Sequence, residues 1–246
     1  MILMLAGEGK TDLGQLRASA AGLVFEPGPM AWIVDQLLAS QLDYSLIESH
    51  HAGADCVVLI SESELAQQAK AGAKKKSPLL PGIKHGKNTG FFTRNAQALG
   101  RLALEKQEKR NTPTIAVLFR DADASRSMSR QTWREKVDSV VRGFKEVQFD
   151  TGVPMIPRPK SEAWILCALK NNYLSCEGLE DAPGNDASPN SLKNQLEQFL
   201  TYSPTAEQQA EWVLSGKIDP QRIMMPSFLE FKQSLADAIE HAAFHR

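Results

Sequence analysis

Residues 114–123 read TIAVLFRDAD, a largely apolar run that ends in two aspartates separated by one residue. The run predicts a buried strand over 114–119, and Asp121 and Asp123 then follow its carboxyl end. Open α/β sheets bind their ligands at that edge. Because paired carboxylates in one tight turn suit Mg²⁺ or Mn²⁺ better than zinc, the pair indicates a metal site. The alternative is an Asp-rich turn that only caps the next helix.

A second acidic turn follows the first predicted strand. Residues 1–12 read MILMLAGEGKTD, and a mixed helical segment is expected from about Leu13. The glycines on both sides of Glu8 indicate a sharp turn that holds its carboxylate beyond the strand. If the helix starts within this turn, Asp12 lies close to Glu8 above the same sheet edge. A P-loop is rejected, because that motif needs a glycine where Met4 stands.

Strand and helix patterns alternate over the first 170 residues. This alternation predicts an α/β fold with a mostly parallel sheet and helices on both faces. A loop rich in Gly and Pro is expected to run to Pro29, where an amphipathic helix begins. Further strands are predicted at 56–60 and 153–156, and further helices at 92–109, 130–144 and 160–170.

The composition changes twice along the chain. Residues 1–170 are predicted to form the catalytic domain, with a basic inserted loop at about 70–94. A polar segment at 177–190 is typical of a mobile connection. Leucine and phenylalanine stripes then predict a helical C-terminal extension at 171–246 that packs on the sheet domain.

The bulk numbers exclude several classes of protein. The 246 residues carry a formal net charge of −1, so polyanion binding requires local clustering of charge. The three cysteines lack metal-type spacing, and Cys56 and Cys167 lie in apolar runs typical of buried thiols, which indicates a reducing cytoplasm. No signal-like start and no apolar stretch of about 18 residues is present, so neither secretion nor membrane insertion is expected. The five histidines lack zinc-site spacing.

Three short motifs, EGKTD at 8–12, DAD at 121–123 and KSEAW at 160–164, together resemble TOPRIM-like nucleases. The first is similar to the E-G-x-x-D motif of OLD-type nuclease domains. The third resembles the serine-and-glutamate element of those nucleases, with a different spacing, and also small stand-alone TOPRIM-like proteins of bacterial abortive-infection systems. The resemblance covers about residues 1–170. It implies that the catalytic Mg²⁺ is bound by Glu8, Asp12, Asp121, Asp123 and Glu162, and that an ATPase of the ABC or AAA type is a partner.

Phosphodiester cleavage agrees with these residue types independently of the resemblance. One or two cations held by these five acids would neutralise charge on the transition state. Glu8 either bridges metals or accepts a proton from the attacking water. Lys160 either offsets charge on the leaving oxygen or is a solvated lysine. Glu162 is either a ligand or a helix-start acid favoured by the macrodipole, and Arg120 is either a phosphate contact or a charge partner of the acids.

A strongly basic segment provides the predicted nucleic-acid surface. Between Lys70 and Arg110 the formal charge is +9, because eleven Lys and Arg face two Glu. Such segregation is typical of polyanion binding, and Phe91 and Phe92 could stack on unpaired bases. The alternative is a solvated charged loop. The residues expected to contact nucleic acid are Lys74, Lys75, Lys76, Lys84, Lys87 and Arg94.

The leading hypothesis is a metal-dependent nuclease acting on DNA or RNA, an endonuclease of an antiphage defence system with an ATPase partner and a possible homo-oligomer. A second hypothesis is a non-catalytic TOPRIM-like subunit that docks a partner. A third is another Mg²⁺-dependent phosphoryl-transfer enzyme. The haloacid-dehalogenase type is disfavoured, because its D-x-D follows the first strand.

Overall fold

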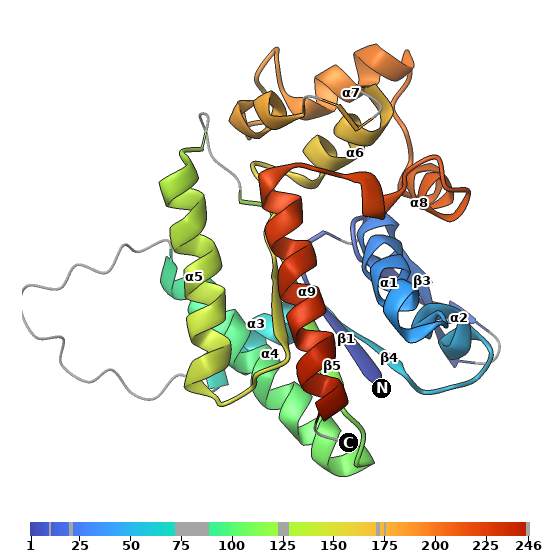
Figure 1. The fold of residues 1–246 in the computed structure, drawn as a ribbon, viewed down its shortest axis with the longest axis vertical. Coiled ribbons are helices and arrows are strands. Elements are labelled where there is room, and N and C mark those ends of the chain that lie inside the picture. The colour runs from blue at the N-terminus through green and yellow to red at the C-terminus, as the bar shows by residue number, and fades with distance from the viewer. Residues whose placement is uncertain are drawn as a thin grey trace, which may run out of the picture.

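The computed structural model describes residues 1–9, 11–19, 22–71, 89–122, 128–170, 173–174 and 176–244. Its centre is a sheet of four parallel strands in the order β4-β1-β5-β6 (Figure 1). The predicted α/β class with a parallel sheet is therefore confirmed. The strands are β1 (Ile2–Gly7), β4 (Val57–Ile60), β5 (Thr114–Phe119) and β6 (Gly152–Met155).

Alternate residues of the strands fill two separate cores, one on each face of the sheet. Leu3 and Leu5 pack on one side, whereas Ile2, Met4 and Ala6 pack on the other. Both faces are covered by helices, as the sequence predicted. The first face carries α1 (Pro29–Leu42), α2 (Leu46–His51), α6 (Ser161–Lys170) and α9 (Pro226–Phe244), and the second carries α3 (Glu62–Ala71), α4 (Thr89–Arg110) and α5 (Arg130–Glu146).

The C-terminal helices share the core of the first face. Leu196 of α7 (Leu192–Leu200) and Val213 of α8 (Ala206–Leu214) belong to it, and α9 lies along β5 and β6 (Figure 1). The helical extension is therefore present, and a short 3-10 helix, η2 (Pro220–Arg222), precedes α9. The predicted domain boundary at residue 170 stays a prediction, although one apolar core crosses it.

The helix expected from Leu13 is wrong. The chain instead forms an antiparallel hairpin of β2 (Gly14–Ser19) and β3 (Gly22–Pro27). Gly14 has a φ of +102° and a Cβ there would lie 2.0 Å from the Glu26 carbonyl oxygen, so only glycine fits this close approach. Asp12 therefore lies at the base of a hairpin and not on a helix.

The prediction of a basic loop at about 70–94 is wrong at both ends of that range. Helix α3 extends to Ala71 and α4 begins at Thr89, so the ends of the predicted range 70–94 are helical. Residues 72–88 lie outside the described residues. Arg94 is consequently a helical residue, exposed on α4.

The prediction of a mobile connection at 177–190 is wrong for the first residues of that segment. It starts with a 3-10 helix, η1 (Glu177–Asp181), in which Glu180 is only 3% exposed. The Arg158 guanidinium donates to Glu180 Oε2 at 3.3 Å and to Asp181 Oδ1 at 2.5 Å. Glu180 Oε1 also accepts from the Ser227 amide at 2.7 Å. The buried ion pair of Arg158 and Glu180 thus joins η1 to the segment before α6, and the bond from Ser227 joins η1 to α9.

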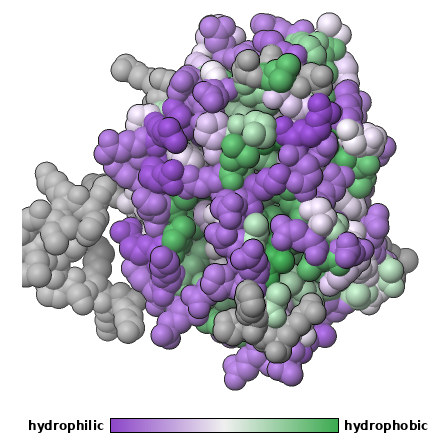
Figure 2. Space-filling view, in the orientation of Figure 1, coloured by the Kyte–Doolittle hydropathy of each residue, from purple (hydrophilic) through white to green (hydrophobic). Residues whose placement is uncertain are grey.

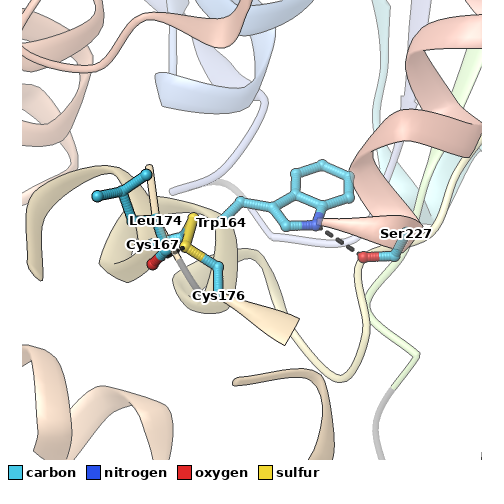
Figure 3. Close-up of a disulfide and its surroundings, with 5 residues drawn as sticks. All are labelled: Trp164, Cys167, Leu174, Cys176 and Ser227. Atoms are coloured by element: carbon cyan, nitrogen blue, oxygen red, sulfur yellow. Dashed lines mark hydrogen bonds between the residues drawn. A yellow bond between two sulfur atoms is a disulfide. The ribbon is translucent and has the colours of Figure 1, made fainter. Parts of the chain in front are cut away.

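A disulfide closes the C-terminal half of α6. Cys167 is bonded to Cys176, nine residues later, as Figure 3 shows. The prediction of a buried thiol at Cys167 is therefore wrong. Disulfides are unusual in cytoplasmic proteins, and the predicted compartment stays a prediction. In the same view the Trp164 indole donates to Ser227 Oγ at 2.9 Å, and Trp164 is completely buried.

The face of the molecule shown in Figure 2 is covered mostly by hydrophilic residues. Within the described ranges, no helix is both long enough and apolar enough to cross a membrane.

Candidate functional site

The carboxyl ends of β1 and β5 bring the two predicted acidic turns together. The strands pair up to Gly7 and Phe119, so Glu8 and Asp121 emerge side by side. The Asp121 amide donates to Glu8 Oε1 at 3.1 Å, and the Arg120 guanidinium lies 2.8 Å from Glu8 Oε2. Glu8 therefore fastens the two strand ends to each other.

Helix α6 begins between Asp12 and Asp121. The Ser161 amide donates to Asp121 Oδ1 at 3.0 Å, and the Ser161 hydroxyl donates to Asp12 Oδ1 at 2.7 Å. Asp121 thus does not cap the helix that follows it, because Ser129 fills that position at α5. It accepts instead from the first residue of a later helix, whose free amides favour negative charge. Two carboxylates from distant parts of the chain therefore meet at one serine.

The hairpin base holds Asp12 in place. Its carbonyl accepts from the Met30 amide at 3.0 Å, which ties the turn to the start of α1. Gly28 packs so closely that a Cβ there would lie 2.3 Å from the Asp12 carbonyl oxygen. Burial raises the pKa of the Asp12 carboxyl, while the hydrogen bonds from Ser161 and Thr11 and the charge of Lys160 act in the opposite direction.

Glu162 is the residue of this site with an unsatisfied oxygen. The side chain as a whole is half-buried, but Oε2 is closed off from solvent and has no hydrogen-bond partner among the residues described. Burial raises the pKa of Glu162, and the nearby Asp12 charge raises it further. Its own amide and Lys160 lower that pKa. The interaction of Glu162 with the helix start, which was the alternative interpretation, is therefore present. In addition, its Oε2 atom is a buried acceptor that needs a partner.

Lys160 is not the solvated lysine of the alternative interpretation. Its side chain is 14% exposed, and Nζ lies 2.9 Å from Asp186 Oδ1. Its charge lowers the pKa of both Asp12 and Glu162, so it lies within electrostatic reach of both acids. Its charge therefore acts on the acids, and its part in catalysis stays a prediction.

Arg120 is a charge partner of the acids. Besides Glu8 it approaches Glu62 at 3.9 Å, and its guanidinium lies 4.3 Å from the centre of the Phe91 ring. Phe92 is 5% exposed and belongs to the second core, so it is not available to stack on bases. The prediction for Phe92 is wrong because the start of α4 turns that side chain inward.

Several predicted residues cannot be placed. Asp123, Lys74, Lys75, Lys76, Lys84 and Lys87 lie outside the described residues. Of the other cations in the basic stretch, Lys106 lies 3.7 Å from Asp55 and Arg110 also pairs with Asp55. Part of the predicted positive charge is therefore neutralised within the fold.

The acids can be tested for their fit to a divalent cation. In the part of the chain that the structure describes, no group of three or more His, Cys, Asp or Glu side chains is arranged to hold a metal. Mg²⁺, however, keeps several waters and is commonly bound through one or two carboxylates. Asp12 and Asp121, which are held by the same serine, and the partnerless Oε2 of Glu162 supply carboxylate oxygens in that number. The residues present therefore fit a hydrated hard cation.

One contributor to this edge was missed in the sequence. Lys136 of α5 is 9% exposed and donates from Nζ to the Ala122 carbonyl. Its position was a usable signal, because a lysine three residues after Trp133 and one before Val137 lies on the apolar face of the helix.

The buried acid predicts an unusual dependence of stability on pH. Because the pKa of Glu162 is raised in the folded state, the folded chain retains its proton when the unfolded chain has lost it. Without divalent metal, stability should therefore fall as the pH rises from the ordinary value of 4.5 through the raised pKa. Glu162→Gln should remove this part of the decline and stabilise the metal-free chain at pH 7 by about 1 kcal/mol. Denaturant unfolding with a chelator at several pH values measures it.

Glu240→Gln is the matched control, because Glu240 is exposed on α9. It should leave the pH dependence as in wild type. A Glu162→Gln curve that runs parallel to wild type at all pH values would contradict the buried-acid interpretation.

Comparisons of the chain with protein-family models, with curated proteins and with solved structures found no match. The resemblance to TOPRIM-like nucleases therefore rests on the three short motifs alone.

Proposed function

We propose that this chain is a Mg²⁺- or Mn²⁺-dependent nuclease that hydrolyses phosphodiester bonds in DNA or RNA. One observation carries the proposal. Asp12 and Asp121 converge on Ser161 at the carboxyl edge of a parallel sheet, and the next residue, Glu162, has a buried oxygen without a described partner. Partly buried carboxylates of raised pKa at such an edge are typical of functional sites.

Asp12, Asp121 and Glu162 are the residues that would hold the cation. Asp123, outside the described residues, is proposed as a further ligand from its place in the D-x-D motif. When bound, the cation would neutralise the charge that develops on the phosphoryl oxygens.

The other residues have separable tasks. Glu8 keeps the ends of β1 and β5 together through the Asp121 amide and Arg120. Lys160 is placed to offset negative charge at the same edge. Ser161 orients two carboxylates at once through its amide and hydroxyl.

The basic segment supports a polyanionic substrate. Five of its lysines fall within residues 72–88 and Arg94 is exposed on α4. An ABC- or AAA-type ATPase partner, a role in antiphage defence and assembly into a homo-oligomer are proposed from the resemblance alone.

The proposal is tested by incubating the purified chain with single- and double-stranded DNA and RNA. Cleavage should require Mg²⁺ or Mn²⁺ and stop with a chelator. Replacing Lys74, Lys75 and Lys76 with alanine should weaken binding and reduce its salt slope by about 0.7 to 0.9 log units per lost phosphate contact. The exposed lysines Lys145, Lys170 and Lys193, changed together, are the control. Cleavage that persists in the chelator would overturn the proposal.

A second candidate function is a non-catalytic subunit that docks a partner. It is favoured by Glu8, whose two oxygens are both engaged, one by the Asp121 amide and one by Arg120. Under that alternative, no metal and no nucleic acid substrate produces cleavage, although the chain binds its partner.

A further inference from the structure

Lys136 is a buried lysine at the acidic edge of the sheet. It lies on α5 between Trp133 and Val140, on the face that packs into the second core, and is 9% exposed. An ammonium group is costly to bury unless it is bonded, so its contacts indicate why a lysine stands there.

The first contact is with the backbone of the acidic turn. Lys136 Nζ donates to the carbonyl of Ala122, the residue directly after Asp121. Nζ also lies 5.5 Å from the centre of the Phe92 ring, and the Arg120 guanidinium lies 5.9 Å from the same ring. Cations at such distances are attracted to an aromatic face. The buried Phe92 ring therefore helps to hold both cations of this edge.

Ala122 is fixed by three separate contacts. Its methyl group is completely buried, its amide donates to the Pro157 carbonyl at 3.2 Å, and its carbonyl accepts from Lys136. Pro157 belongs to the segment that leads into α6. The backbone that follows β5 is thus held between α5 on one side and the approach to α6 on the other.

We propose that Lys136 is a positioning residue for the acidic site. By holding the Ala122 carbonyl, it fixes the backbone from which the Asp121 carboxylate reaches the Ser161 amide. This inference rests on the proposed function, because it assigns Lys136 to the geometry of the metal-binding carboxylates. Lys136 lies on α5, and none of the predicted acids belongs to that helix.

A positioning role and a purely electrostatic role of Lys136 predict opposite changes in metal affinity when the lysine is removed. A lysine that acted only through its charge would repel a cation, so its removal would strengthen metal binding. A lysine that positions the turn has the opposite effect, because its removal loosens the carboxylates that bind the metal.

The experiment is Mn²⁺ binding by isothermal titration calorimetry, which needs no catalysis. Lys136→Met, which keeps the length of the side chain but cannot donate, should raise the Kd for Mn²⁺ about tenfold or more. Lys136→Arg keeps a donor and a charge and should restore the Kd to within a few-fold of wild type. Lys145→Met, a change of an exposed lysine on the same helix, should leave the Kd unchanged.

Folding is checked for each variant by circular dichroism. If Lys136→Met does not fold, Lys136→Gln takes its place, because its shorter amide cannot reach as far as the lysine ammonium. Equal or tighter Mn²⁺ binding by the folded variant, with normal binding by wild type, overturns the positioning role and leaves the proposed function intact. No Mn²⁺ binding by wild type overturns the proposed function and this inference with it.

Discussion

Glu8→Gln is expected to lower metal-dependent cleavage about a thousandfold, equivalent to roughly 4 kcal/mol of transition-state stabilisation. The amide can still accept from the Asp121 N–H, but it no longer neutralises Arg120, which lies 2.8 Å from Glu8 Oε2. The uncompensated guanidinium then repels a cation at this edge. Asp121→Asn should have a similar effect while keeping an acceptor for the Ser161 amide. Initial cleavage rates at high Mn²⁺ measure both changes.

Stability distinguishes a loss of chemistry from a loss of fold. Because the pair of Glu8 and Arg120 is about three-quarters buried on both sides, Glu8→Gln should cost about 1 to 2 kcal/mol of unfolding free energy. Glu62→Gln is the matched control. It removes the same charge from the other side of Arg120, at 3.9 Å, but from a side chain that is 59% exposed. Wild-type cleavage by Glu8→Gln, or an equal loss in Glu62→Gln, would contradict the assigned role.

Arg158→Met is expected to cost about 3 to 5 kcal/mol of stability, because it leaves the buried Glu180 carboxylate without its cation. The Arg158 and Glu180 side chains are 10% and 4% exposed. The guanidinium also donates to the Met128 carbonyl, from Nε at 3.1 Å and from a terminal nitrogen at 2.9 Å. Arg158 thus joins Met128, just before α5, to Glu180 of η1. Denaturant unfolding monitored by tryptophan fluorescence measures the change.

Arg134→Met provides the comparison for this large effect. Arg134 pairs with Glu230, but its side chain is 45% exposed, so the loss should cost no more than about 1 kcal/mol. If the two variants unfold at the same denaturant concentration, the ion pair of Arg158 is not the structural link that its burial indicates.

The central sheet was predictable because its strands are buried on both sides. Residues 114–119 form a continuous apolar run of strand length, and the structure gives β5 the same bounds. The start of α1 at Pro29 was equally readable, since proline is favoured in the first turn of a helix.

The hairpin β2-β3 was not predictable from periodicity. Most of its residues are exposed, including Leu23 at 69%, so no apolar face alternates with a polar one. Helix α8 had a usable signal that periodicity missed, a capping box formed by Thr205 and Gln208.

The acidic residues at the carboxyl edge of the sheet were predictable one by one, but the hydrogen bonds that connect them were not. Strand ends placed Glu8 and Asp121 together, as parallel pairing requires. The bond from Ser161 to Asp12 joins residues 149 positions apart, and no local pattern encodes such a contact. Glu180 was likewise assigned to a mobile connection because its segment is polar, and no local pattern indicated its partner Arg158, which stands between two prolines.

The most direct measurement is an anomalous difference map from crystals soaked in Mn²⁺. We expect a peak at the carboxyl edge of the sheet, about 2.2 Å from carboxylate oxygens of at least two of Asp12, Asp121 and Glu162. A map with no peak at this edge in fully soaked crystals, or with manganese bound only elsewhere, would contradict this expectation.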